Sequence, residues 1–244
     1  MRILRHIIIT ILLITPILTS AQSFIKEKND TTTVTEYNDG RLWAYKQIGD
    51  IIVGMTNYEE SDKYGKYYQI AIFVKNLGDS TITFNPGKIV ASLYSKKGDT
   101  LGLKVYTYDK YMKKVKNVQA WSMALTGFST GLNTGMAGYQ TTYHTSFSPT
   151  GMPYTQIHST YNHAAASAAN MAATTQIMTL KDMMSEEKKT ISQGYLKTNT
   201  IHHDVGILCY MNIKRKRGEA MTVYIMVCDD VFSFNWDVSK KTKK

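Results

Sequence analysis

The segment Gly127-Phe128-Ser129-Thr130-Gly131 matches the G-x-S-x-G pattern that carries the nucleophile of many serine hydrolases. Such a serine needs a strand that enters the turn and a helix that leaves it. The residues at 118–126 have helical spacing instead, and no alternating strand and helix pattern surrounds them. Asp182 and then His202 or His203 follow in hydrolase order, so a serine hydrolase that uses Ser129 stays as a remote alternative.

The remaining residues that could support chemistry are scattered along the chain. His158 and His163 lie five positions apart, and His202, His203 and Asp204 form a short polar turn. A zinc site needs three or four converging ligands, and the sequence has neither an H-E-x-x-H motif nor paired cysteines. We therefore expect no metal site, no cofactor and no catalytic residue, and we expect that the protein is not an enzyme.

The two cysteines, Cys209 and Cys228, lie in a segment that predicts a β-hairpin over 205–228, with its turn near 215–218. In that hairpin Cys209 lies opposite residues near Val223, several positions from Cys228. A disulfide requires Cα atoms about 5.5 Å apart. We therefore expect two buried or half-buried thiols.

The first 21 residues have the features of a secretory signal peptide. Arg2 and Arg5 precede an apolar run over 7–18, and small residues fill positions 19–21. The run is shorter than the ~20 residues that span a bilayer. We expect cleavage after Ala21 and export to the periplasm, the cell surface or the outer envelope. Loss of the two arginines lowers the formal charge from +10 to +8.

Positive charge gathers in clusters near 110–116, 214–217 and 240–244. The candidate basic patch consists of Lys113, Lys114, Lys116, Arg215 and Arg217. Such a patch attracts anionic lipids or polysaccharides, although solvated turns produce the same pattern. No nucleic-acid-binding motif is present, so we expect no nucleic acid partner. The 17 tyrosines are compatible with glycan binding, but no motif supports it.

Short strand-like segments lie on both sides of the middle of the chain. In the first block, 42–107, the residues Tyr68, Ile70, Ile72 and Val74 alternate onto one face. Strand candidates return over 194–236, where Phe234 and Trp236 are expected in the core. Turn signals roughly every 8–12 residues indicate an antiparallel sandwich or barrel. A polar leader at 22–41 precedes these blocks, and a basic tail at 237–244 follows them.

The insert at 108–193 has a different composition. No charged residue occurs from Asn117 to Leu180, a run of 64 positions, whereas average usage is about a quarter charged. If 110–138 is helical, large and small residues form two neighbouring rows. The large row is Val118, Trp121, Leu125, Phe128, Leu132 and Met136, and the small row is Ala120, Ala124, Gly127, Gly131, Gly135 and Gly138. An apolar ridge beside a groove favours close approach by another helix.

A second helix is predicted over 163–192, and it is the expected partner of the first. Its inner row has helical spacing and comprises Ala166, Ala169, Ala173, Ile177, Leu180 and Met184. The connection at 139–162 is expected to be a long loop. Glycines inside the first helix oppose it by about 1 kcal/mol each. A flexible insert and a membrane-inserted one therefore stay as alternatives.

The order of these blocks resembles a known group of proteins. The segment YYQIAIFVKNLGDSTITFNPGKIVAS (67–92) is followed by a lysine cluster leading into VQAWSMAL, then by the Gly/Ala/Tyr/Ser-rich insert, QGYLKTNTI and a last hairpin. This pattern resembles uncharacterised exported proteins of Bacteroidota-type bacteria over most of the mature chain. The resemblance implies an immunoglobulin-like sandwich with an insert, and it transfers no activity. His202-His203 stands where that pattern has a Pro- or Asn-containing turn.

The fold that these observations predict is mainly β, an immunoglobulin-like antiparallel β-sandwich interrupted by an α-helical small-residue insert, and α+β overall. The predicted function is a non-catalytic, exported, envelope-associated binding protein whose insert mediates self-association or contact with a protein partner. The candidate contact residues are Trp121, Gly127, Phe128, Gly131, Gly135 and Ala169. The alternative is a membrane-active protein whose uncharged insert adsorbs to or enters a bilayer.

Overall fold

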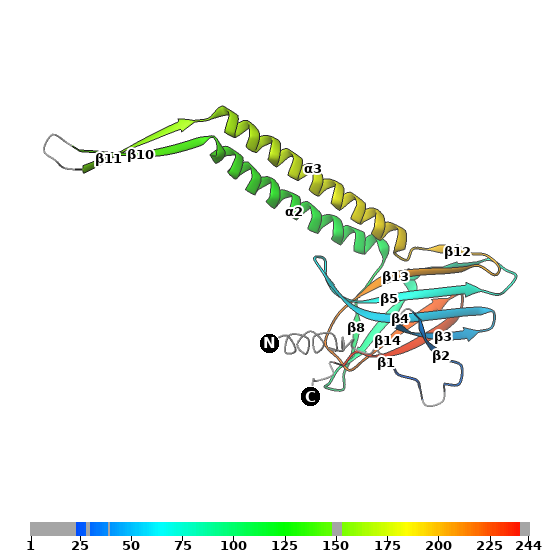
Figure 1. Cartoon of the computed structure of the whole chain (residues 1–244). Helices are drawn as coiled ribbons and strands as arrows, with labels where there is room; N and C mark the ends of the chain where they lie inside the picture. Colours follow the sequence, from blue (N-terminus) through cyan, green and yellow to red (C-terminus); the bar gives the residue numbers. More distant parts are fainter. Residues whose placement is uncertain (1–22, 28–29, 39, 148–152, 240–244) are drawn as a thin grey trace, which may run out of the picture. The chain divides into compact units, whose positions relative to one another are not determined.

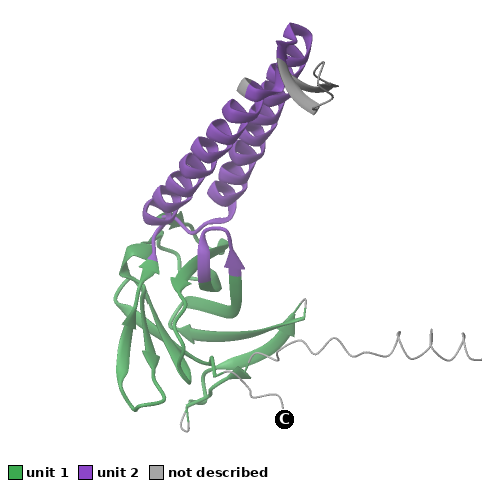
Figure 2. Cartoon of the chain, turned by 90° about the vertical axis from the view of Figure 1, so that its left-hand side faces the viewer, with its two compact units in different colours: residues 1–60, 67–105, 198–244 green, residues 61–66, 106–197 purple. Residues whose placement is uncertain are grey.

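The computed structural model describes residues 23–27, 30–38, 40–147 and 153–239. The predicted signal peptide at 1–21 and the end of the basic tail lie outside the described residues. The chain divides into two compact units (Figure 2), one of residues 1–60, 67–105 and 198–244, and one of residues 61–66 and 106–197. The second unit contains the predicted insert and also takes in the short segment 61–66.

The first unit consists mainly of two antiparallel β-sheets (Figure 1). The five-stranded sheet has the order β1-β15-β14-β7-β8, and the six-stranded sheet has the order β2-β3-β4-β5-β13-β9. The strands of the first sheet are β1 (Ser23–Phe24), β7 (Val90–Tyr94), β8 (Thr100–Leu103), β14 (Ala220–Val227) and β15 (Asp230–Asp237). Those of the second are β2 (Val34–Asn38), β3 (Arg41–Ile48), β4 (Ile51–Asp62), β5 (Gly65–Asn76), β9 (Val105–Tyr106) and β13 (Gly206–Lys214). A small pair joins β6 (Ile82–Phe84) to β12 (Asn199–Ile201), and a 3-10 turn, η1 (Pro86–Lys88), follows β6.

Alternating apolar residues form the core of this unit. Tyr68, Ile70, Ile72 and Val74 on β5 are all buried, as their spacing predicts. On β15, Phe232, Phe234 and Trp236 are fully buried, so both sheets contribute to the core. Each large apolar side chain buried in this way stabilises the fold by about 1.5–3 kcal/mol. The predicted mainly β, α+β architecture is confirmed.

The described residues of the polar leader contribute two strands, β1 and β2, to the sheets. β1 pairs with β15, where Phe24 lies opposite Trp236 at a ring-centroid distance of 5.4 Å, and β2 pairs with β3. Between these strands the Asp30 carboxylate accepts hydrogen bonds from Thr32 and Thr33 and pairs with Lys46 at 3.0 Å. The expectation of a simple leader is therefore wrong, because its polar residues satisfy one another at the sheet edge.

The predicted hairpin over 205–228 is also wrong. β13 pairs with β5 in one sheet, whereas β14 pairs with β15 and β7 in the other, so residues 215–219 cross between the sheets. The long-range partners offer apolar faces in register, and these determine strand pairing more strongly than a local turn. Cys209 and Cys228 are not joined by a disulfide. Cys228 is exposed in the turn after β14, at a φ of 54°, which contradicts the expected buried thiol.

The second unit contains a pair of long helices joined by a β-hairpin (Figure 1). The helices are α2 (Tyr108–Ala137) and α3 (His163–Gly194), close to the predicted ranges. The strands β10 (Tyr139–Phe147) and β11 (Pro153–Tyr161) pair antiparallel. The expected long loop at 139–162 is therefore wrong, because its Thr and Tyr residues favour strands. The side chain of Asn162 caps α3 by accepting a hydrogen bond from the Ala165 amide at 3.1 Å.

Asp30→Asn should destabilise the first unit by about 2 kcal/mol at neutral pH, measured by urea unfolding, because the buried site loses its charged acceptor. The Thr33 hydrogen bond, with those of Lys46 and Thr32, outweighs burial and holds the pKa of Asp30 far below its usual value of 3.8. The stability that Asp30 contributes is therefore fully present at pH values above 3.8, and it declines as the pH falls below 3.8. Asp229→Asn, in an exposed turn, is the control, and equal stability of the two variants would contradict the assignment.

Candidate functional site

The contact between α2 and α3 contains many small or polar side chains. On α2 the residues Met112, Val115, Gln119 and Thr130 are buried, with Thr126 half-buried between them. On α3 the least exposed residues follow the predicted inner row, Ala166, Ala169, Ala173, Ile177, Leu180 and Met184. Small residues let two helix backbones approach closely. We call this contact the seam.

The hydroxyls of the seam are satisfied within their own helix. Thr130 Oγ1 donates to the carbonyl of Thr126 at 2.7 Å, with the Gly127 carbonyl at 3.1 Å. Thr134 Oγ1 donates to the Thr130 carbonyl at 2.9 Å. A threonine bonded in this way presents its methyl group to a neighbour and needs no polar partner on it.

The large apolar residues of α2 lie on the opposite face. Trp121 is 72% exposed, Phe128 is 69% exposed and Met136 is 73% exposed. Leu125 and Leu132 complete the same stripe and are also more than half exposed. At about 100° per residue these positions lie roughly 180–260° around the helix from the buried Gln119. We call Trp121, Leu125, Phe128, Leu132 and Met136 the apolar ridge.

Of the small row, Gly127 and Gly131 flank the apolar ridge and do not pack on α3, whereas Gly138 is buried against Tyr161 at the end of β11. A Cβ atom built on Gly127 or Gly131 meets nothing within 4 Å. At these two glycines the expectation that the row packs on the second helix is therefore wrong, because the side of α2 that carries Gln119, Thr126 and Thr130 faces α3 instead. Ala169 lies on the inner row of α3, within the helical pair. The surroundings of Gly135 lie outside the described part of the structure.

One carboxylate oxygen connects three parts of the second unit. Glu187 Oε2 on α3 accepts hydrogen bonds from the Tyr64 hydroxyl at 2.5 Å and from Gln119 Nε2 at 3.1 Å, and it pairs with Lys63 Nζ at 2.7 Å. Gln119 Nε2 also lies 3.2 Å from the Met184 carbonyl. Since Gln119 points into the helical pair, these bonds fix the rotation of α2 about its axis.

The charges of this network are stable near neutral pH. Burial would raise the pKa of Glu187, but hydrogen bonds from Lys63, Tyr64 and Gln119 outweigh it and lower that pKa. The hydrogen bond to Glu187 raises the pKa of Lys63, and burial together with Glu187 raises the pKa of Tyr64. The carboxylate therefore stays charged and the two donors stay protonated. The arrangement holds the helices together and is not poised for proton transfer.

Ser129 does not occupy a nucleophile elbow. It lies inside α2, and its Oγ donates to the Thr126 carbonyl at 3.0 Å. No strand runs into this position, so Ser129 lacks the strand–turn–helix geometry that a serine hydrolase requires.

The predicted basic patch is divided between the two units. Lys113, Lys114 and Lys116 lie near the start of α2, whereas Arg215 and Arg217 lie on the segment that crosses from β13 to β14. Arg215 and Arg217 line a pocket of the first unit. Three further cations line the same pocket: Lys96, Lys97 and Lys216. The sequence prediction missed Lys96 and Lys97, for which the only local signal was the Lys97-Gly98-Asp99 turn.

The histidine turn makes polar contacts within the first unit. Nδ1 of His202 lies 3.2 Å from Thr81 Oγ1, and Nδ1 of His203 lies 3.1 Å from the Gly78 carbonyl. Across the described residues, no three His, Cys, Asp or Glu side chains gather in a group suited to a metal ion. Neither α2 nor α3 combines the length and apolarity that a membrane span requires. In comparisons with known proteins, no family model, curated protein or solved structure matches this chain.

Glu187→Gln should lower the stability of the second unit by about 2 kcal/mol, because three donors lose a charged, partly buried acceptor. Thermal unfolding followed by the helical circular dichroism signal measures the change. Since folding lowers the pKa of Glu187 from 4.5, its contribution should be present above that pH and decline as pH falls below it.

Glu186→Gln is the matched control for this variant. Glu186 is an exposed neighbour whose carboxylate lies 3.7 Å from Lys189 Nζ, and such surface pairs contribute about 0–1 kcal/mol. Equal unfolding temperatures for the two variants would show that Glu187 does not hold the helical pair together.

Proposed function

We propose that this chain is a non-catalytic, exported, envelope-associated interaction protein, and that two copies associate through the apolar ridge of α2. The observation that carries the proposal is the direction of this ridge. Its five large side chains are between 53% and 73% exposed, whereas much of the seam between α2 and α3 consists of small threonine and alanine side chains. A helical pair that functioned alone would gain stability by turning the ridge inward.

The ridge offers a large gain in free energy to any surface that covers it. It extends over about 22 Å of helix, from Trp121 to Met136. Full burial of one large apolar side chain contributes about 1.5–3 kcal/mol. Five such residues on one continuous face are unusual for a surface that stays in water.

A second copy of the chain fits this surface because α2 carries both a ridge of large side chains and a neighbouring groove of glycines. The apolar ridge lies beside Gly127 and Gly131, which face open space. In a two-fold arrangement the same patch is used on both copies, so each ridge can fill the glycine groove of the other. The stretch 117–180 is uncharged, so two copies of a basic protein meet there without charge repulsion. Two helical pairs joined in this way resemble a four-helix bundle.

The finer features of the fold and location belong to the same proposal. The two antiparallel sheets and their short turns support an immunoglobulin-like sandwich for the first unit. The Arg2, Arg5 and apolar run pattern supports a signal peptide over 1–21 and a location in the periplasm or at the cell surface. In this proposal the small row acts as a glycine zipper between copies.

Replacing Leu125 and Phe128 together with serine should abolish association, because both side chains lie at the centre of the ridge. Sedimentation equilibrium of the mature chain over a range of concentrations measures the change. Met171 and Met178 on α3 are exposed to a similar extent, 71% and 61%, so their double serine variant is the matched control. A wild-type chain that stays monomeric, or equal effects of the two double variants, would contradict the proposal.

The exposed Trp121 and Phe128 also suit adsorption to a bilayer, which the same variants test. Flotation with vesicles of phosphatidylethanolamine and phosphatidylglycerol separates the two functions. Self-association without flotation supports the proposal. Flotation that depends on Leu125 and Phe128, from a chain that is monomeric in solution, would replace it with the membrane function.

Gly131→Leu should weaken self-association at least tenfold and leave the monomer folded. The new side chain enters open space in the monomer, but it fills the groove that the proposed ridge of a second copy occupies. Gly131→Ala is the control, since it keeps most of the groove and stabilises the helix by up to about 1 kcal/mol. Unchanged association of the leucine variant would show that the glycine row is not part of the interface.

A further inference from the structure

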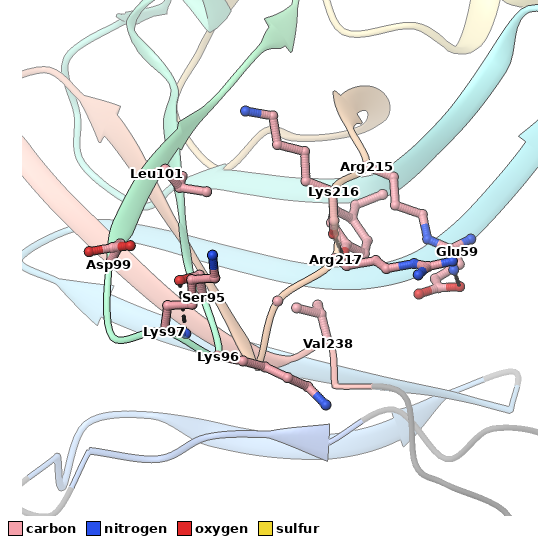
Figure 3. Close-up of a pocket in the computed structure, with 12 residues that line it drawn as sticks. Glu59, Ser95, Lys96, Lys97, Asp99, Leu101, Arg215, Lys216, Arg217 and Val238 are labelled. Carbon is pink, nitrogen blue, oxygen red and sulfur yellow. Dashed lines mark hydrogen bonds and ion pairs between the residues drawn. The ribbon is translucent and has the colours of Figure 1, made fainter.

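A pocket of about 660 Å³ lies in the first unit, and Figure 3 shows the residues that line it. The turn between β7 and β8, residues 95–99, forms one side, and the segment that crosses from β13 to β14 forms the other. Tyr68 from β5, Leu101 from β8 and Val238 supply apolar surface. The volume is within the range of about 300–1,000 Å³ that is typical of small-molecule sites.

The charges that line this pocket are mostly positive and mostly uncompensated. Five cations stand against two carboxylates, which leaves a formal charge of +3; the lining charges are Lys96, Lys97, Arg215, Lys216, Arg217, Glu59 and Asp99. Arg215 is neutralised by Glu59, with Nη2 and Oε2 2.6 Å apart. Within the described part of the chain, Lys96, Lys97, Lys216 and Arg217 form no ion pair.

Hydrogen bonds hold the backbone of both walls in place. The buried Tyr68 hydroxyl donates to the Lys216 carbonyl at 2.6 Å, and the Glu219 amide donates to the Tyr94 carbonyl at 2.9 Å. Gly218 lies so close to Leu93 that a Cβ there would approach the Leu93 side chain to 2.5 Å. In the opposite turn the Ser95 amide donates to the Asp99 carbonyl at 2.8 Å. A pocket that is preformed loses less free energy to ordering when a ligand binds.

We propose that this pocket binds an organic phosphate, a dianionic phosphate group attached to an apolar body. The net positive charge of the lining attracts a dianionic phosphate, and the guanidinium of Arg217 can bind two of its oxygens at once. The apolar wall formed by Tyr68, Leu101 and Val238 receives the body of the ligand. The pocket lies between the β7–β8 turn and the crossing segment, and its volume suits one small molecule or one lipid head group better than an extended polymer. This site is independent of the helical ridge and of the proposed self-association.

Calorimetric titration of the mature chain with phenyl phosphate tests the site, with inorganic phosphate as the comparison. Phenyl phosphate should bind about tenfold more tightly, because its ring is buried on the apolar wall. Equal affinity for the two, or no binding of phenyl phosphate at millimolar concentration, would overturn the proposal.

Arg217→Gln should weaken phenyl phosphate binding about tenfold, the loss expected for one charge-assisted contact. Lys214→Gln is the matched control, because Lys214 is an exposed cation nearby that does not line the pocket. Equal losses in the two variants would reduce the effect to net charge and overturn the proposal. The unfolding temperature of each variant separates lost binding from lost folding.

Flotation with vesicles that contain phosphatidic acid distinguishes two sources of the phosphate. Flotation that Arg217→Gln abolishes and Lys214→Gln preserves identifies a lipid head group as the ligand. Binding of phenyl phosphate without flotation identifies a free organic phosphate. Both results support the site only together with phenyl phosphate binding in the titration, and flotation without that binding contradicts it.

Discussion

The hydrogen bonds that Glu187 accepts determine how the second unit presents its surface. Gln119 is buried in the helical pair and donates to this carboxylate, with Tyr64 and Lys63 bonded to the same oxygen. With Gln119 turned inward, a residue two positions later points about 200° away. Trp121 and the rest of the apolar ridge therefore face solvent. A polar contact at one end of the pair thus creates the apolar face on which the proposed association depends.

The elements of the fold followed from sequence more readily than their partners did. Alternation on β5 and helical spacing at 110–138 and 163–192 are local patterns, and the structure has the corresponding strand and helices. The pairing of β13 with β5 and of β14 with β15 depends on residues far apart in the chain. For this reason the local turn at 215–218 suggested a hairpin that does not form. The β10–β11 hairpin was missed because its strands lack apolar alternation.

The sequence predicted less of the candidate sites than of the fold. The sequence identified the members of the apolar ridge and of the small row, but it did not reveal which face of α2 meets α3. That choice depends on the hydrogen bonds of Gln119. Its partners Tyr64 and Glu187 lie 55 and 68 positions away from it in the sequence. Arg215 and Arg217 were recognised as a charge cluster, whereas the pocket around them exists only because the crossing segment meets the β7–β8 turn. The spacing of residues within one element does not reveal which distant segment packs against that element.

Self-association as proposed requires the apolar ridge of one copy to meet α2 of another. A photo-crosslinking phenylalanine analogue in place of Phe128 tests it most directly, in a mixture of isotope-labelled and unlabelled mature chains. We expect covalent dimers in which the crosslinked peptides join one labelled and one unlabelled chain, within residues 117–138. Crosslinks confined to single chains, or no dimers at concentrations where the wild-type protein associates, would contradict it.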